Sequence, residues 1–373
     1  MDNEKFEIFY LREVKMMWTN EKKDPELRNN VISLAHRFDK SNMAKVITDS
    51  PRQIETALEM PLPEIPRGNF DRVIIAGMGG SALPAEVVMD AFAEHIIIPI
   101  SVVRHYYLPK SIKGNCLIIV SSFSGETEET LSILEKLPNN STNVVVISAG
   151  GRLKTKALQR GYPYIEIPTN NEPSGFQPRS AVGYFVTFFA RILVLAGVMD
   201  DFHSEFSSVP QFLRDLDIRG DAEDVALWMK DQIPVVYTDE LHQMSIARIT
   251  KIKLNENSKR PAFFNCFPEG NHNEMIGLSK KGLGNFCVLY LHDPSSHPRI
   301  YERFDVMRKV FEENRMNHIS FRKWEIPGTT MIEKIFAALM FADWCSYTLA
   351  ILDQIDPTPV VLVESFKKAL SPI

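Results

Sequence analysis

The chain has 373 residues, of which 45% are hydrophobic and 24% charged, and its net charge is −5. This length is enough for two domains with cores of their own, and the ordinary composition indicates a globular protein. The acidic balance gives no general reason to expect nucleic acid as a partner. The four cysteines stand far apart, and the first residues are charged and unlike a secretory signal, so we expect free thiols and a cytoplasmic location.

The first 60 residues show helical patterns. Pro25 follows Asp24 at a position typical of a helix start, and Ile54, Ala57 and Leu58 share one helical face. The stretch MPLPEIP then ends the pattern. We therefore predict a helical arm over residues 1–50.

Strand-like and helical stretches alternate after the arm. Such alternation, with β-branched runs that show no polar face, predicts an α/β fold with a parallel sheet covered on both sides. Ligands of such sheets bind beyond the carboxyl ends of the strands. The strand-like runs of this part are 72–76, 98–103, 117–121, 143–148 and 164–167.

The first strand runs into a glycine-rich turn, DRVIIAGMGGSA, at residues 71–82. Gly77, Gly79 and Gly80 allow a tight turn, and Ser81 adds a hydroxyl before a helix begins. The free N–H groups of that helix end favour an anion, most simply a phosphate.

A dinucleotide is the competing ligand for this turn. Gly77, Gly79 and Ala82 satisfy the spacing G-x-G-x-x-G/A. The fingerprint also needs an acidic residue near the end of the next strand, and Arg104 stands there instead. A cation at that place suits only a 2′-phosphate, so a dinucleotide is the weaker reading.

A second turn of the same kind is SSFSGETEET, residues 121–130. Ser122, Ser124 and Thr127 place three hydroxyls around one turn, and Gly125 lets the backbone approach a ligand. The alternative is an ordinary Ser/Thr helix cap, for which one hydroxyl would suffice. Three hydroxyls beside a glycine favour a neutral phosphate cradle, and the missing P-loop lysine argues against nucleotide hydrolysis.

The remaining half of the chain repeats the α/β pattern. The apolar stretch 183–199 is short for a membrane span and holds Arg191, so we expect a buried helix and no membrane partner.

Polar residues 200–222 suggest a linker. Beyond it come strand-like runs at 233–240, 286–291 and 318–326, with helical runs to Leu254, over 298–314 and over 329–355.

Six short motifs together resemble one family. GMGGSA and SFSGET resemble the phosphate loops of the sugar isomerase (SIS) family, which binds phosphosugars. PRSA at 178–181, NENSK at 255–259, FPEGNHNEMIG at 267–277 and DPTPV at 356–360 resemble its bifunctional phosphoglucose/phosphomannose isomerases. The resemblance implies two tandem SIS domains, each a parallel sheet flanked by helices, at 51–205 and 215–373.

The resemblance also implies an activity. Such enzymes interconvert glucose 6-phosphate and mannose 6-phosphate with fructose 6-phosphate through a cis-enediol, with no cofactor and no metal. Glu256 would be the base that moves the proton between carbons, and Arg179 would offset the enediolate charge. His272 would open the sugar ring from the neighbouring subunit of a homodimer, and Lys367 would contact the sugar. The expected phosphate-binding residues are Gly79, Gly80, Ser81, Ser122, Ser124 and Thr127.

The sequence is compatible with several alternative interpretations. His272 is also compatible with a buried structural histidine, or with a zinc ligand beside Glu274. Lys368 competes with Lys367 for the role toward the sugar. Glu126 stands where the family often has asparagine, and its carboxylate would repel phosphate unless it points away. The chain could also be a non-catalytic phosphosugar sensor, or an isomerase of another phosphosugar.

Overall fold

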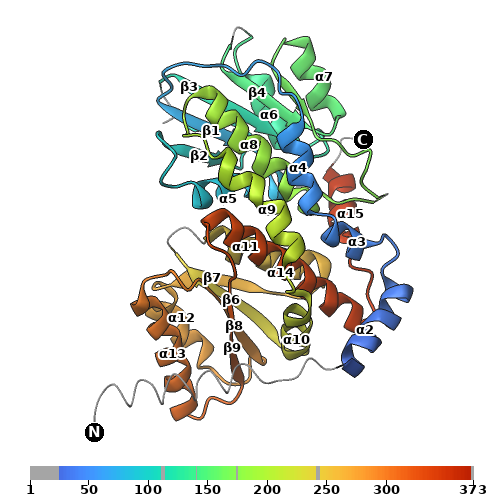
Figure 1. Ribbon diagram of the computed structural model, residues 1–373, viewed down its shortest axis with the longest axis vertical. Helices are drawn as coiled ribbons and strands as arrows, with labels where there is room; N and C mark the ends of the chain where they lie inside the picture. The colour runs from blue at the N-terminus through green and yellow to red at the C-terminus, as the bar shows by residue number, and fades with distance from the viewer. Residues whose placement is uncertain (1–24, 111–113, 140, 174, 241–243, 371–373) are drawn as a thin grey trace.

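Two parallel β-sheets, each flanked by helices, form the body of the protein (Figure 1). The computed structural model describes residues 25–110, 114–139, 141–173, 175–240 and 244–370. The predicted α/β class with two parallel sheets is confirmed. Of the predicted N-terminal arm, residues 1–24 lie outside the described residues, and most of the remainder is helical.

The elements of the first half surround the first sheet and include two short 3-10 turns, η1 and η2. In chain order they are α2 (Pro25–Phe38), α3 (Met43–Thr48), α4 (Pro51–Glu59), β1 (Arg72–Ala76), η1 (Gly79–Ser81), α5 (Leu83–Ala91), β2 (Ile100–Val103), β3 (Cys116–Ser121), α6 (Glu128–Lys136), β4 (Val144–Ser148), α7 (Gly151–Gln159), β5 (Tyr164–Glu166), η2 (Pro178–Ser180) and α8 (Val182–Ala196).

The elements of the second half surround the second sheet. In chain order they are α9 (His203–Asp215), α10 (Arg219–Met229), β6 (Ile233–Asp239), α11 (Met244–Asn257), β7 (Phe263–Phe267), α12 (Gly270–Leu278), β8 (Phe286–His292), α13 (Pro298–Glu313), β9 (Ile319–Glu325), α14 (Met331–Leu352) and α15 (Val361–Leu370).

The first sheet has the strand order β2-β1-β3-β4-β5 with every pair parallel. Val73, Ile74 and Ile75 of β1 are fully buried, as expected for a strand with helices on both faces. The chain leaves β1 in one direction to reach β2 and returns past β1 to reach β3. The carboxyl ends of β1 and β3 therefore mark the point where the strand order reverses.

The second sheet repeats this order on a smaller scale, as β7-β6-β8-β9, again with parallel pairs. Strand β7 and helix α12 were not predicted from the sequence. Strand β7 lies at the edge of the sheet and reads FFNCF, and α12 is a short helix rich in polar residues. Neither shows the long apolar run or clear periodicity by which the other elements were predicted.

The predicted linker at residues 200–222 is wrong, because α9 and α10 occupy this stretch. Phe206, Val209 and Leu213 recur at helical spacing on α9 and are all buried. Polar residues fill the opposite face and lower the average hydrophobicity of the stretch. The apolar stripe, and not the average, indicates the helix.

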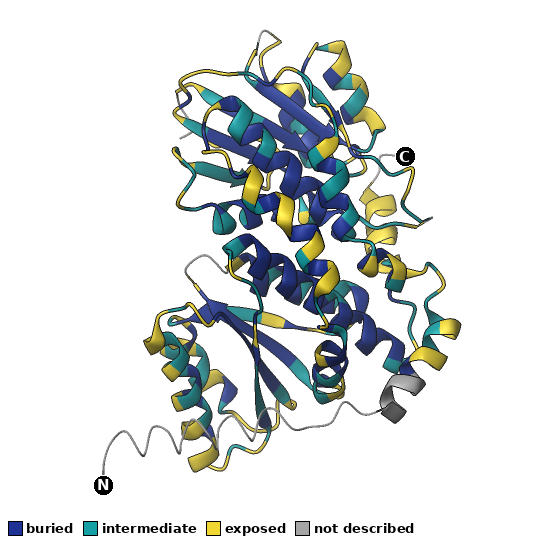
Figure 2. Cartoon of the chain, viewed as in Figure 1, coloured by how far each residue is buried: buried dark blue, intermediate teal, exposed yellow. Residues whose placement is uncertain are grey.

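Two apolar helices, α8 and α14, form the middle of the core (Figure 2). The predicted buried helix at 183–199 is confirmed as α8, where Arg191 donates to the carbonyls of Ala57 (2.5 Å) and Met60 (2.7 Å). Among the described helices, α14 is long and apolar enough to cross a membrane, but most of it is buried inside the protein. One apolar cluster runs through both helices and joins the two halves.

Candidate active site

The two phosphate-type turns lie side by side at the carboxyl ends of β1 and β3. These strands are neighbours in the sheet, with Ala76 opposite Val120. Residues 77–82 follow β1 and residues 122–127 follow β3, so both turns meet where the strand order reverses. Open parallel sheets bind their ligands at such a point.

Ser81 connects the two turns. Its Oγ accepts a hydrogen bond from the backbone N–H of Phe123 (2.8 Å), and its carbonyl accepts one from the Ser121 hydroxyl (2.7 Å). Ser81 is buried. Its hydroxyl therefore holds the second turn against the first, which is a role the sequence did not indicate.

The hydroxyls of the second turn form a compact group. Ser122 Oγ lies 2.8 Å from Thr127 Oγ1 and also accepts the N–H of Gly125 (3.1 Å). Ser124 is exposed, and its Oγ accepts the N–H of Glu126 (3.2 Å). Thr127 stands at the start of α6 without capping it, so the first N–H groups of that helix are left for another acceptor.

Glu126, the departure from the family motif, points away from the hydroxyls toward α7. Its carboxylate accepts the backbone N–H of Arg152 (2.7 Å) and the Nε–H of the same residue (2.7 Å). Partial burial raises the pKa of Glu126, but the hydrogen bonds and the charge of Arg152 outweigh this and lower it. The negative charge is therefore paired at the first turn of α7.

Gly80 brings Arg179 to the first turn. A Cβ on Gly80 would lie 2.9 Å from the carbonyl carbon of Pro178 and 3.0 Å from the backbone N of Arg179. Only a residue without a side chain permits this approach of η1 to η2. The sequence pattern explained Gly80 by its own turn, whereas the structure adds a contact with a segment 98 residues later.

Arg179 is buried and is held from three directions. Its Nε donates to Asn257 Oδ1 (2.6 Å), and its NH2 donates to the carbonyls of Pro357 (3.1 Å) and Thr358 (2.7 Å). Its NH1 lies 3.4 Å from a carboxylate oxygen of Glu256, which is partly exposed. Burial lowers the pKa of Arg179, and the charge of Glu256 opposes the shift. The structure thus brings Arg179 and Glu256 together beside the phosphate-type turns.

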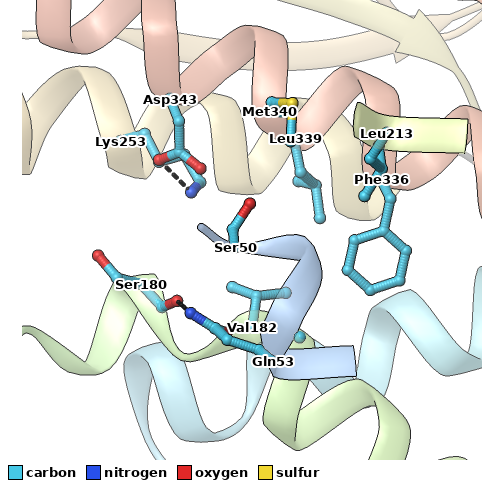
Figure 3. A pocket seen from close by; sticks show the side chains of 11 residues that line it. Ser50, Gln53, Ser180, Val182, Leu213, Lys253, Phe336, Leu339, Met340 and Asp343 are labelled. Carbon is cyan, nitrogen blue, oxygen red and sulfur yellow. Dashed lines mark hydrogen bonds and ion pairs between the residues drawn. The ribbon is translucent and has the colours of Figure 1, made fainter. Parts of the chain in front are cut away.

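A second ion pair lies near enough for the charge of Arg179 to act on it. It lines a small cavity of about 30 Å³ (Figure 3). Lys253 of α11 pairs with Asp343 of α14, and both line the cavity. Burial raises the pKa of Asp343, which the charges of Lys253 and Arg179 oppose. Gln53 also lines the cavity and donates from Nε2 to the Ser180 carbonyl (2.8 Å). This network supports η2 and the last turns of α11 from the inside.

His272 and Lys367 lie elsewhere in the chain. His272 is exposed on α12, which packs against β7 and α13, and Lys367 is exposed on α15. Helices α12 and α15 lie on opposite sides of the molecule (Figure 1). A single chain therefore does not place both side chains at the Glu256 carboxylate.

The zinc alternative finds no support among the described residues, where no group of three or more His, Cys, Asp or Glu side chains is placed to hold a metal. Glu274, the other residue of that alternative, accepts a hydrogen bond from the buried Tyr237 hydroxyl. The sequence interpretation assigned no role to Asn257, Lys259 and Thr358. All three belong to the motifs NENSK and DPTPV. The motifs could therefore have pointed to these residues, although the chemistry of each side chain taken alone did not.

Known proteins have sequences similar to most of this chain. A bifunctional phosphoglucose/phosphomannose isomerase from Caldicellulosiruptor bescii is 31% identical, with 89% of this chain and 99% of that protein covered. This chain belongs to the bifunctional phosphoglucose/phosphomannose isomerase family. A second member of the family, from Thermoplasma acidophilum, is also 31% identical over 82% of this chain and 91% of its own.

The second half and the fold have matches of their own. Residues 218–370 match the bacterial phospho-glucose isomerase C-terminal SIS domain. A solved structure of the C-terminal domain of glucosamine-fructose-6-phosphate aminotransferase from Francisella tularensis superposes with a TM-score of 0.67. It is 14% identical, with 86% of this chain and 98% of that chain covered. At this identity the likeness concerns the fold, and it agrees with the two parallel sheets of the family member described here.

The Gly80 contact is open to a direct test. Gly80→Ala would force a methyl group against the backbone of residues 178–179, where no flexible side chain can yield. We expect the free energy of unfolding to fall by about 1–3 kcal/mol, the usual cost of overpacking, measured by urea denaturation. Gly277→Ala is the matched control, because nothing lies within 4 Å of its Cβ. Equal stability of the two variants would contradict the close approach.

Proposed function

We propose that this protein is an aldose–ketose isomerase that interconverts fructose 6-phosphate with glucose 6-phosphate and mannose 6-phosphate. Both relatives described above carry the name bifunctional phosphoglucose/phosphomannose isomerase. The observation that carries the proposal is the pair of Glu256 and Arg179, a partly exposed carboxylate 3.4 Å from a buried guanidinium. A base and a fixed cation side by side suit a reaction that passes through an enediolate.

The phosphate of the substrate binds the two turns in this proposal. Ser122, Ser124 and Thr127 offer hydroxyls, and the uncapped N-terminus of α6 offers N–H groups. Gly79 and Gly80 shape the first turn, and Ser81 holds it against the second. The pairing of Glu126 with Arg152 keeps the carboxylate from repelling the phosphate.

The sugar then extends from the phosphate toward Glu256. The Glu256 carboxylate takes the proton from C2 of the open-chain aldose and returns it to C1, while a second proton passes from the C2 hydroxyl to the C1 oxygen, which gives the ketose. The Arg179 guanidinium stabilises the negative charge that develops on the enediolate oxygen. Glucose and mannose phosphates differ only at C2, so reprotonation of either face of the planar intermediate yields both aldoses.

Ring opening needs a further acid–base group, and we assign it to His272 of a partner subunit in a homodimer. Within one chain α12 lies far from the side that carries α15 (Figure 1). Helix α15 exposes large apolar side chains, of which Leu362 is 86% and Phe366 64% exposed, and Ile276 of α12 is 80% exposed (Figure 2). A second copy that covers these helices would bring Lys367 and His272 toward the site.

The activity is tested by incubating the purified protein, after treatment with a chelator, with fructose 6-phosphate. We expect both glucose 6-phosphate and mannose 6-phosphate as products, because the enediolate is accessible from both faces. Identification of the sugars by enzyme-coupled assay or NMR is the measurement. Binding without turnover would instead favour a phosphosugar sensor, and activity only after zinc is restored would contradict the metal-free route.

The role of Glu256 is tested with Glu256→Gln. The amide keeps the size of the side chain but cannot accept a proton at neutral pH. We expect kcat to fall by about 10²–10⁴-fold, the usual contribution of a general base, with substrate affinity nearly unchanged. Exchange of the C2 proton with solvent deuterium should fall in parallel. Glu64→Gln, an exposed glutamate in the loop before β1, is the control, and similar turnover of both variants would place the base elsewhere.

The shared site is tested by mixing two inactive variants, His272→Ala and Glu256→Gln. If His272 crosses the interface, a mixed dimer holds one site with both groups and one with neither. Complete subunit exchange of an equal mixture should restore about a quarter of the wild-type activity. Monomeric protein with full activity at high dilution would contradict the shared site.

A further inference from the structure

Lys259 lies two residues beyond the end of α11, and its side chain closes the last turn of that helix. Its Nζ donates to the carbonyls of Glu256 (2.7 Å) and Asn257 (3.1 Å), which the end of the helix leaves without an intrahelical partner. A cation is favoured at this end of a helix. The backbone of Lys259 has φ 57°, a left-handed conformation that is uncommon for a residue with a side chain and is retained only where the surroundings hold it.

The same ammonium also reaches a distant segment of the chain. Lys259 Nζ donates to the Pro357 carbonyl (2.9 Å), and Arg179 NH2 donates to that carbonyl as well (3.1 Å). Two cations therefore converge on one backbone oxygen between the end of α11 and α15. Carbonyl oxygens beside them offset part of the repulsion between the cations, since each is the negative end of a dipole.

We propose that Lys259 is a positioning residue of the active site, which sets the Glu256 carboxylate relative to Arg179 by tying the last turn of α11 to residues 356–358. The inference rests on the proposed roles of Glu256 and Arg179. Lys259 acts through the backbone on both of them, because it binds the carbonyl of Glu256 and shares the Pro357 carbonyl with Arg179.

The charges around Lys259 give this contact a pH dependence. Lys259 as a whole is exposed, but its ammonium lies among backbone carbonyls next to Arg179. Partial burial of this ammonium and the Arg179 guanidinium lower the pKa of Lys259 to about 8, while Asp356 and Glu256 oppose the shift. A neutral amine has two N–H groups and can no longer donate to three carbonyls. The contact should therefore weaken, and kcat should fall, as the pH rises through about 8.

The titration of Lys259 should not itself lower the stability of the fold in this range. The unfolded lysine keeps its proton up to about pH 10.4, so between the two pKa values the unfolded state binds more protons than the folded one. The contribution of Lys259 to the free energy of unfolding therefore increases as the pH rises between these two values. A decline in kcat that depends on Lys259, without a fall in Tm that depends on Lys259, separates a positioning role from a merely structural one.

The experiment compares the pH profiles of kcat, KM and Tm for wild type, Lys259→Arg and Lys259→Met. We expect Lys259→Arg, whose charge persists at all these pH values, to lose the decline above pH 8 that wild type shows. Lys259→Met should lower kcat by about tenfold to a hundredfold at pH 7, with a smaller change in KM. Lys230→Met, at an exposed lysine after α10, is the control and should match wild type.

Three kinetic outcomes would overturn the proposal: a wild-type kcat that stays constant through pH 9.5, the same alkaline decline in Lys259→Arg, or full turnover of Lys259→Met. Hydrogen exchange gives a readout that does not need the activity. The backbone amides of residues 358–361 should exchange faster in Lys259→Met than in the control, and equal rates would also contradict the proposal. A wild-type protein that forms no isomerase products would refute the proposed function. The exchange rates would still show whether Lys259 holds the segment at Pro357.

Discussion

A single buried guanidinium, that of Arg179, connects the parts of the chain on which the site depends. It donates to Asn257, 78 positions later, and to the Thr358 carbonyl, 179 positions later. An unpaired buried cation would cost several kcal/mol, so every one of these acceptors is needed where it stands. Since η2 also touches the first phosphate-type turn through Gly80, the two halves are held together at the site itself.

The two sheets share a strand order but have different chemistry at their switch points. In the first half, hydroxyls and uncapped N–H groups follow β3 and leave room for an anion. In the second half Asp293 follows β8, and its carboxylate accepts bonds from Lys334 Nζ (2.8 Å) and from the N–H of Ser295 (2.8 Å). In the second half the protein's own carboxylate already uses a cation and a backbone N–H at the end of β8, which favours the first half for the proposed phosphate site.

Sequence reasoning failed where an element has a weak or divided pattern. Helix α9 has an apolar stripe on one face and polar residues on the other, and the edge strand β7 has no run of β-branched residues. The helix of α12 was likewise not predicted, although its residues were recognised as a motif. In each case packing against the rest of the fold, and not local propensity, stabilises the element.

The sequence by itself determined the α/β class, the two turns after β1 and β3, and the motifs that mark the family. These features follow from local chemistry: buried strands are apolar throughout, and tight turns need glycine. Only the tertiary structure decided that Glu126 pairs with Arg152, that Ser81 joins the two turns, and that Lys259 and Arg179 share the Pro357 carbonyl. Each of these contacts joins segments far apart in the chain, and a hydrogen bond depends on distance and direction in space, which no local pattern contains.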